Sequence, residues 1–190
     1  MTEKIRKTQQ QRRDEAQAAV LGSARKLFAE KGYNQANLDD IANLCGLTTR
    51  PIYHYFGNKQ GLFSAVTESL EQELAEEIKL AFEQNNEQLN AAWQAFIRVC
   101  KQQDFRQIVL LDAPNVLGRQ RWHDSEVVQL AEQALTHYLP NSPAHATLIT
   151  RMLLVALAEA ALVIAESDDT EQFIQAANDI VEQLLGSLQP

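Results

Sequence analysis

The sequence predicts an all-α protein of about nine helices, and three observations support that class. Apolar residues recur at helical spacing along most of the chain, and no run alternates as a half-buried strand would. Polar or proline-bearing breaks separate the periodic segments, while glycine and proline are otherwise scarce at seven and five copies. Hydrophobic residues make up 45% of the 190 residues, which is enough to fill one substantial core or two small ones.

A short helix is predicted from about residue 38 to 45, because local residues mark both of its ends. The Asn37 side chain can cap the helix start, and Asp40 stands three residues later in the capping-box position. Gly46 can supply the positive φ that ends the helix. Three apolar residues recur at helical spacing and should form one buried face: Leu38, Ile41 and Leu44.

A second short helix is predicted to begin at about Thr48, a further N-cap candidate. Pro51 fits there only in the first turn, where its missing N–H would have had no helical partner. Arg50 precedes the proline, so its backbone is expected to be slightly distorted. Ile52 and Phe56 are four residues apart and should pack against the apolar face of the preceding helix.

Two helices joined by a short glycine-bearing turn form a helix-turn-helix, whose second helix enters the major groove of DNA. Arg50 is the predicted base reader, since a guanidinium can bond a guanine bidentately, and Thr48 and Thr49 can touch base edges or phosphates. Four further residues would hold phosphates: Tyr53, His54, Tyr55 and Lys59. The alternative interpretation is a compact helical corner whose polar residues merely face solvent.

A stretch over about residues 24–66 resembles the N-terminal domain of the TetR family of transcriptional regulators. The resemblance rests on Ala-Arg-Lys-Leu-Phe-Ala-Glu-Lys-Gly-Tyr at 24–33, Leu-Asp-Asp-Ile-Ala at 38–42, Gly-Leu at 46–47, Ile-Tyr-His-Tyr-Phe at 52–56 and Asn-Lys at 58–59. It implies a homodimeric repressor with a DNA-binding domain at 1–58 and an effector-binding and dimerisation domain at 59–190. A small effector would release the palindromic operator, with the fourth helix carrying the movement. The residues themselves do not fix whether the ligand releases DNA or promotes binding.

The resemblance also implies which residues contact DNA: Asn37, Thr48, Thr49, Arg50, Tyr53, His54, Tyr55 and Lys59. The chain departs from the family at Asn37, which is often threonine or serine there, and at Arg50 and Pro51, where the family varies freely. These departures leave the fold unaffected but make the operator sequence unpredictable.

The charge distribution supports the same division of the chain. Residues 1–61 carry ten Lys and Arg against six Asp and Glu, whereas residues 62–190 carry seven against nineteen. Only the N-terminal part should therefore approach the phosphate backbone. Five basic residues fall in a Gln-rich, largely structureless lead-in that either follows the DNA backbone or is simply a solvated tail: Lys4, Arg6, Lys7, Arg12 and Arg13.

Six further helices are predicted, at about 59–82, 87–102, 104–114, 119–138, 145–166 and 170–188. Pro114 should end the third of these. The last two carry the oligomerisation signal, because the run 152–165 is apolar nearly all round and a wide apolar stripe follows it. Two such pairs would form a four-helix bundle across a two-fold axis, and a core helix pair within a monomer is the alternative.

An effector pocket is predicted between helices of the C-terminal part, where an apolar ligand usually lies in a bundle. Its candidate lining residues are large aromatics and nearby polar groups, for which core packing, capping or solvation are the alternatives: Trp93, Phe96, Phe105, Asp112, Asn115, Arg119, Trp122 and His123. The sequence does not identify the ligand.

Several other classes are disfavoured by the sequence. No metal-ligand spacing, phosphate loop or nucleophile motif is present, so neither catalysis nor a metal or other cofactor is expected. The charged N-terminus favours a cytoplasmic protein, and the run 152–165 is shorter than the roughly 20 residues of a membrane span, which predicts a buried helix. Cys45 and Cys100 should be reduced thiols. The principal rival is a helical ligand-binding or scaffold protein without specific DNA binding.

Overall fold

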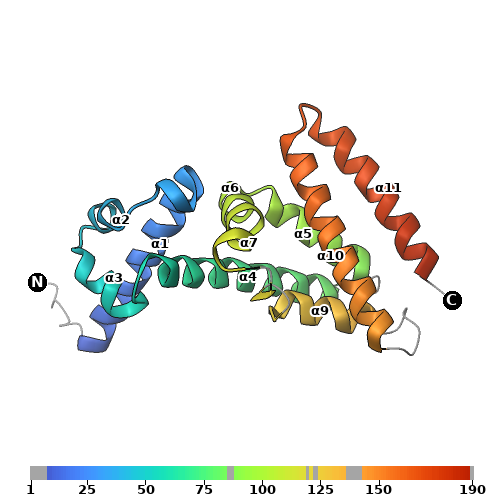
Figure 1. Cartoon of the computed structure of the whole chain (residues 1–190). Coiled ribbons are helices and arrows are strands. Elements are labelled where there is room, and N and C mark those ends of the chain that lie inside the picture. Colours follow the sequence, from blue (N-terminus) through green and yellow to red (C-terminus); the bar gives the residue numbers. More distant parts are fainter. Residues whose placement is uncertain (1–7, 85–87, 119, 122–123, 136–142, 189–190) are drawn as a thin grey trace, which may run out of the picture.

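The computed structural model describes residues 8–84, 88–118, 120–121, 124–135 and 143–188. Within those ranges the chain is helical with no strand, which confirms the all-α class. Figure 1 shows a small N-terminal group of helices at one end and the last two helices at the other. The long helix α4 (Lys59–Gln84) extends from the first group into the second part of the molecule.

The N-terminal group, called the head below, consists of α1 (Gln9–Gln35), α2 (Leu38–Leu44), α3 (Thr49–Phe56) and the first turns of α4. Its core contains an aromatic cluster among aliphatic side chains. Phe28 and Phe63 are fully buried and meet edge to face with ring centroids 5.1 Å apart, and Tyr33 packs on Phe63 at 4.9 Å. Because α1 and α4 both contribute to this cluster, they hold α2 and α3 against a rigid base.

The remainder, called the body, consists of the rest of α4 with α5 (Gln88–Cys100), α9 (Glu126–Leu135), α10 (Pro143–Glu166) and α11 (Thr170–Leu188). A connecting segment, α6 (Gln103–Phe105), η1 (Arg106–Asp112) and α7 (Ala113–Val116), lies between head and body. The predicted helix at 119–138 is observed as α9 from 126 to 135, and residues 119, 122–123 and 136–138 lie outside the described ranges.

The predicted helix end at Pro114 is wrong, because the helical backbone continues through it to Val116. Proline lacks an N–H and its ring would clash with the carbonyl four residues earlier in a regular α-helix. The preceding η1 is a π-helix whose wider turn carries Ala113 N–H to the Ile108 carbonyl, five residues back. This widening lets the helix accommodate Pro114 instead of ending there.

Two other expectations also need correction. Arg12 and Arg13 are helical rather than structureless, because Thr8 and Gln11 form a reciprocal capping box that starts α1 ahead of them. Leu44 does not join the buried face of α2, since it is 47% exposed while Ile41 is fully buried. Leu38, at the other end of the predicted apolar face, does pack against the core.

The head is fastened to the connecting segment by polar contacts. Arg25 in α1 pairs with Asp104 at 2.6 Å and with Glu73 of α4 at 2.6 Å. Partial burial lowers the pKa of Arg25, but the two carboxylates outweigh burial and raise it overall. Farther along α1, the Tyr33 backbone N–H donates to the Asp112 carboxylate at 2.7 Å.

Helix α10 is not the buried helix that was expected. Several of its large apolar side chains are exposed, with Met152 at 71%, Val155 at 66% and Leu148 at 61%. By length and composition alone, 147–166 could also span a membrane, with a mean hydropathy of 2.1 and 17% of its residues buried. Phe173 and Ile180 of α11 are large apolar residues that are exposed as well, at 42% and 57%.

Candidate nucleic-acid interface and pocket

Helices α2 and α3 form the predicted helix-turn-helix, and local hydrogen bonds fix the turn between them. The Asn37 Oδ1 accepts from the Asp40 backbone N–H at 2.7 Å, which caps α2. Gly46 has a φ of +69°, which lets the next residue, Leu47, donate its N–H back to the Ala42 carbonyl at 2.9 Å. The chain therefore reverses within a few residues and presents the start of α3 outward.

Helix α3 buries one side and exposes the other. On the inner side of α3, Ile52 is fully buried. On the outer side, Arg50 and His54 are exposed and Tyr53 is 55% exposed. Thr49 and Tyr55 are half-buried, and Thr48 is exposed at the N-cap position without making a side-chain capping bond. The exposed side of α3 therefore carries the polar and aromatic groups that could contact DNA bases and phosphates.

Lys59 lies at the start of α4, next to this surface. Its ammonium is 4.5 Å from the centre of the Tyr33 ring and donates to the Asn34 carbonyl at 3.3 Å. Partial burial against these neighbours lowers the pKa of Lys59. These contacts hold the Lys59 ammonium in a defined position at the first turn of α4, where it could contact a phosphate.

Asn37, another predicted DNA contact, is also engaged within the protein. Besides capping α2, its amide donates to the Asp40 carboxylate at 3.0 Å, and that carboxylate also pairs with Lys31 at 2.9 Å. The hydrogen bond from Lys31 lowers the pKa of Asp40. A contact between Asn37 and a phosphate would therefore add to, or compete with, a local network.

Gly61 is a structural requirement of this surface that the sequence analysis missed. A Cβ at this position would collide with the Phe56 carbonyl oxygen, and the Gly61 N–H donates to the Asn58 Oδ1 at 2.8 Å. The close approach of α3's last turn to the start of α4 thus depends on glycine. The sequence does contain a signal for this requirement, because Gly61 falls just after the predicted helix start at Lys59.

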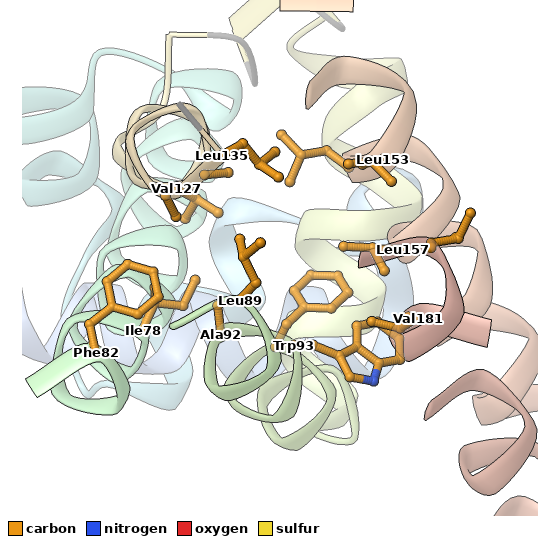
Figure 2. Close-up of a pocket in the computed structure, with 15 residues that line it drawn as sticks. Ile78, Phe82, Leu89, Ala92, Trp93, Val127, Leu135, Leu153, Leu157 and Val181 are labelled. Atoms are coloured by element: carbon orange, nitrogen blue, oxygen red, sulfur yellow. The ribbon is translucent and has the colours of Figure 1, made fainter. Parts of the chain in front are cut away.

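The body contains an apolar cavity of about 90 Å³ between α4, α5, α9, α10 and α11. Figure 2 shows its lining side chains converging from these helices, including Phe82, Leu89, Leu153 and Leu157. The Trp93 ring N–H donates to the Asn178 Oδ1 at 2.8 Å, so the one hydrogen-bond donor of the Trp93 side chain is already used.

The structure places two of the predicted pocket residues, Trp93 and Phe96, in the wall of this cavity. Phe105 is instead fully buried in the core, and Asp112 accepts from the Tyr33 N–H. Asn115 donates its side-chain amide to the Leu111 carbonyl at 3.0 Å. The remaining three lie outside the described residues: Arg119, Trp122 and His123.

An ion pair between Glu71 of α4 and Arg121 was also not foreseen. The guanidinium donates to both carboxylate oxygens at 2.7 and 2.8 Å, and the Glu71 side chain is 9% exposed. Burial raises the pKa of Glu71, although its hydrogen bonds with Arg121 act in the opposite direction. Fifty residues separate the two, so no sequence pattern could have paired them.

Across the described ranges, no group of three or more His, Cys, Asp or Glu side chains is arranged to hold a metal ion. Cys100 is buried, and burial raises the pKa of its thiol to about 12. A thiol with that pKa stays protonated near neutrality and is inert as a nucleophile.

Comparisons with known proteins agree with this architecture. Among named relatives, the transcriptional activator FasR of Mycolicibacterium smegmatis is 31% identical over 87 residues, covering 44% of this chain and 40% of FasR. The chain therefore aligns with less than half of that relative's length. A crystal structure of a TetR-family regulator from Pectobacterium atrosepticum shares 28% identity with a TM-score of 0.65, covering 96% of this chain and 98% of that one.

A second solved structure, FadR of Bacillus subtilis in complex with stearoyl-CoA, has a TM-score of 0.73 at 18% identity, covering 88% of this chain and 96% of that one. At that identity it shows the fold alone.

Two family matches divide the chain between them. Residues 20–66 match the bacterial regulatory proteins of the tetR family, and residues 86–188 match the tetracyclin repressor-like C-terminal domain. The members of this family are transcriptional regulators rather than enzymes. The second match alone spans more than half of the chain, and the helix-turn-helix lies inside the first. The chain therefore belongs to the TetR family of bacterial transcriptional regulators.

Proposed function

We propose that the protein is a homodimeric, cytoplasmic repressor that binds a palindromic operator and is released by a small-molecule effector. The observation that carries the proposal is the outward face of α3, where Thr48 and Arg50 are exposed directly after a hydrogen-bonded turn. A rigid helix start with an exposed guanidinium suits bidentate contact with guanine in the major groove. Arg50 is the proposed base reader.

The phosphates on either side would be held by the remaining predicted contacts. Tyr53 and His54 project from the exposed face of α3, and Lys59 stands at the start of α4. The positive balance of residues 1–61 favours approach of this end to DNA, while the acidic remainder disfavours other orientations. Phosphate contacts position the reading helix, and Arg50 would specify the sequence.

Dimerisation is proposed through α10 and α11, with a second copy of this chain as the partner. Leu148, Met152 and Val155 lie exposed on α10, and Phe173 and Ile180 on α11, so both helices lack cover on the same part of the molecule. Burying such side chains between two copies would form a four-helix bundle. A two-fold dimer would also set two reading helices about 34–36 Å apart, as a palindrome requires.

The effector is proposed to bind the apolar cavity of the body. FadR of Bacillus subtilis, whose fold is similar, was solved with stearoyl-CoA bound. In this chain α4 lines the cavity with Ile78 and Phe82 and also packs in the head through Phe63. A ligand that favours a different position of α4 would change the separation of the two heads, and it needs a coupling of only about 1–3 kcal/mol.

The decisive experiment is fluorescence anisotropy with the intergenic DNA beside the protein's own gene, at several salt concentrations. Wild type should bind selectively and weaken as salt rises, whereas Arg50→Ala should lose about 1–3 kcal/mol of sequence discrimination. Arg98→Ala is the matched control, because Arg98 is an exposed arginine of α5 in the body. Weak binding that is equal for all sequences and both variants would favour a ligand-binding scaffold instead.

The dimer is tested separately by Met152→Asp. A carboxylate in the centre of the exposed apolar face should abolish association, because a buried unpaired charge is strongly unfavourable. Sedimentation velocity should then report a monomer with unchanged helical content by circular dichroism, and operator affinity should fall. Gln102→Asp introduces the same carboxylate at an exposed position outside α10 and α11 and serves as control. A Met152→Asp variant that remains dimeric would refute this interface.

A further inference from the structure

A second cavity, of about 170 Å³, lies where α5 and η1 meet the end of α10 and the start of α11. It shares no described lining residue with the apolar cavity of the body. The elements around it pack on one another, since α10 contacts α5, η1 and α11, and α11 also contacts α5. Four buried residues form its floor: Ile97, Cys100, Ala161 and Ile164.

Two cationic side chains, those of Lys101 and Arg106, belong to the lining of this second cavity. Lys101 is exposed, whereas Arg106, the first residue of η1, is half-buried. Burial raises the pKa of the Cys100 thiol in the floor, and the charge of Arg106 partly opposes that rise. The Arg106 guanidinium therefore lies close enough to the floor for its charge to act there.

Arg106 lacks the kind of partner that the two other half-buried arginines of the described chain have. Arg25 pairs with two carboxylates, and Arg121 donates to both carboxylate oxygens of Glu71. No described residue makes a hydrogen bond or ion pair with the Arg106 side chain, and the Asp169 carboxylate at the start of α11 caps that helix instead. A partly desolvated guanidinium gains most from a carboxylate, which can accept two parallel charge-assisted bonds.

We propose that this second cavity binds a small molecule that has one carboxylate and an apolar remainder. The carboxylate would accept from the Arg106 guanidinium as Glu71 accepts from Arg121, and Lys101 would add positive charge at the rim. The apolar part would be buried against the floor. The described lining of the apolar cavity contains no ionisable side chain, so the two cavities would take different ligands. The proposal does not depend on the effector role of the apolar cavity or on DNA binding.

The test uses three probes, benzoate, benzamide and acetate, with the full-length protein and no DNA. Benzamide has the shape of benzoate without its charge, and acetate has the charge without the ring. Amide chemical shifts in two-dimensional NMR give both the affinity and the location of each probe. Benzoate should produce saturable shifts around Lys101, Ala165 and Thr170, and it should bind at least about tenfold more tightly than benzamide or acetate.

Arg106→Gln should weaken benzoate binding about tenfold or more, because it removes the charged donor and keeps a polar side chain. Arg98→Gln is the matched control, since it makes the same change of charge in α5 at an arginine that pairs with Glu77 at 3.6 Å and does not line this cavity. It should leave benzoate affinity unchanged. Arg106 has no described partner to lose, so Arg106→Gln should also keep the Tm of the wild type.

Ala165→Leu tests the apolar part of the site without removing either cation. Ala165 is half-buried in the cavity wall, so a larger side chain should fill space that the ring needs and weaken benzoate binding, with helical content unchanged by circular dichroism. Unchanged benzoate affinity in this variant would contradict burial of the ring here.

Four other results would overturn the proposal. Benzoate affinity could be equal in wild type and Arg106→Gln, or benzamide could bind as tightly as benzoate. Benzoate shifts could be confined to the apolar cavity around Trp93, or benzoate could show no saturable binding at all.

Discussion

The two ends of the molecule differ in how completely they bury their apolar side chains. The head encloses its own core, with Phe28 and Phe63 fully buried and in edge-to-face contact. The α10 and α11 pair leaves large apolar side chains outside, with Met152 at 71% and Phe173 at 42% exposed. A self-contained head can keep its geometry while its polar surface meets DNA. The terminal pair is incomplete by itself, which is why a second copy is its proposed partner.

The largest expected effect is on the free energy of unfolding, and it should differ between the two ends. Phe28→Ala should lower the free energy of unfolding by about 3–5 kcal/mol, because it removes a fully buried ring and leaves a cavity. Phe173→Ala, an aromatic truncation on exposed α11, should change the unfolding of the monomer by less than about 1 kcal/mol. Urea denaturation at low protein concentration measures both. Similar losses in the two variants would break the comparison.

A smaller effect tests the buried ion pair between Glu71 of α4 and Arg121. Arg121→Met should cost about 1.5–3 kcal/mol, because Glu71 is then left buried without its bidentate partner. Burial already raises the pKa of Glu71 above its usual 4.5, and loss of Arg121 should raise it further. The folded variant then binds a proton more tightly than the unfolded chain, so its stability should recover as pH falls towards 4.5.

Urea denaturation at pH 5 and pH 8 provides the measurement for Arg121→Met. The double variant Glu71→Gln with Arg121→Met has no titrating carboxylate at this position and should lack that recovery. If Arg121→Met is destabilised equally at both pH values, Glu71 is not desolvated in the way that its burial indicates.

The smallest effect concerns the junction of α3 and α4 within the head. Gly61→Ala should destabilise by about 1–3 kcal/mol, because its methyl group would collide with the Phe56 carbonyl oxygen. Gly22→Ala in α1 is the control, since nothing lies within 4 Å of an added Cβ, and it should stabilise by about 0.5–1 kcal/mol. Thermal denaturation distinguishes these signs. A stabilising Gly61→Ala would mean that α3 can shift away from α4 without cost.

The parts of the fold that could be predicted are those with local causes. Asn37, Gly46 and Pro51 act on their own backbone or on residues within one turn, so the sequence predicted the helix-turn-helix that they delimit. Leu44 shows the limit of periodicity, which indicates the side of a helix but not the extent of its neighbour.

The features that could not be predicted depend on distant residues. Arg25 pairs with Asp104 across 79 positions, and Arg121 with Glu71 across 50. Trp93 and Phe96 could be proposed for a pocket because they are large aromatics in the body, whereas Phe105 shares that character and lies in the core.

The contact between Tyr33 and Asp112 provides a built-in reporter of how the head is docked. Gly32, with a φ of +71°, kinks α1 so that the next backbone N–H points to a carboxylate of the connecting segment, 79 residues away in the chain. The hydrogen-exchange rate of that single amide should therefore report how often the head separates from the connecting segment. Its protection should weaken in any state that swings the head away, so this one proton would follow the proposed transition between DNA-bound and released forms.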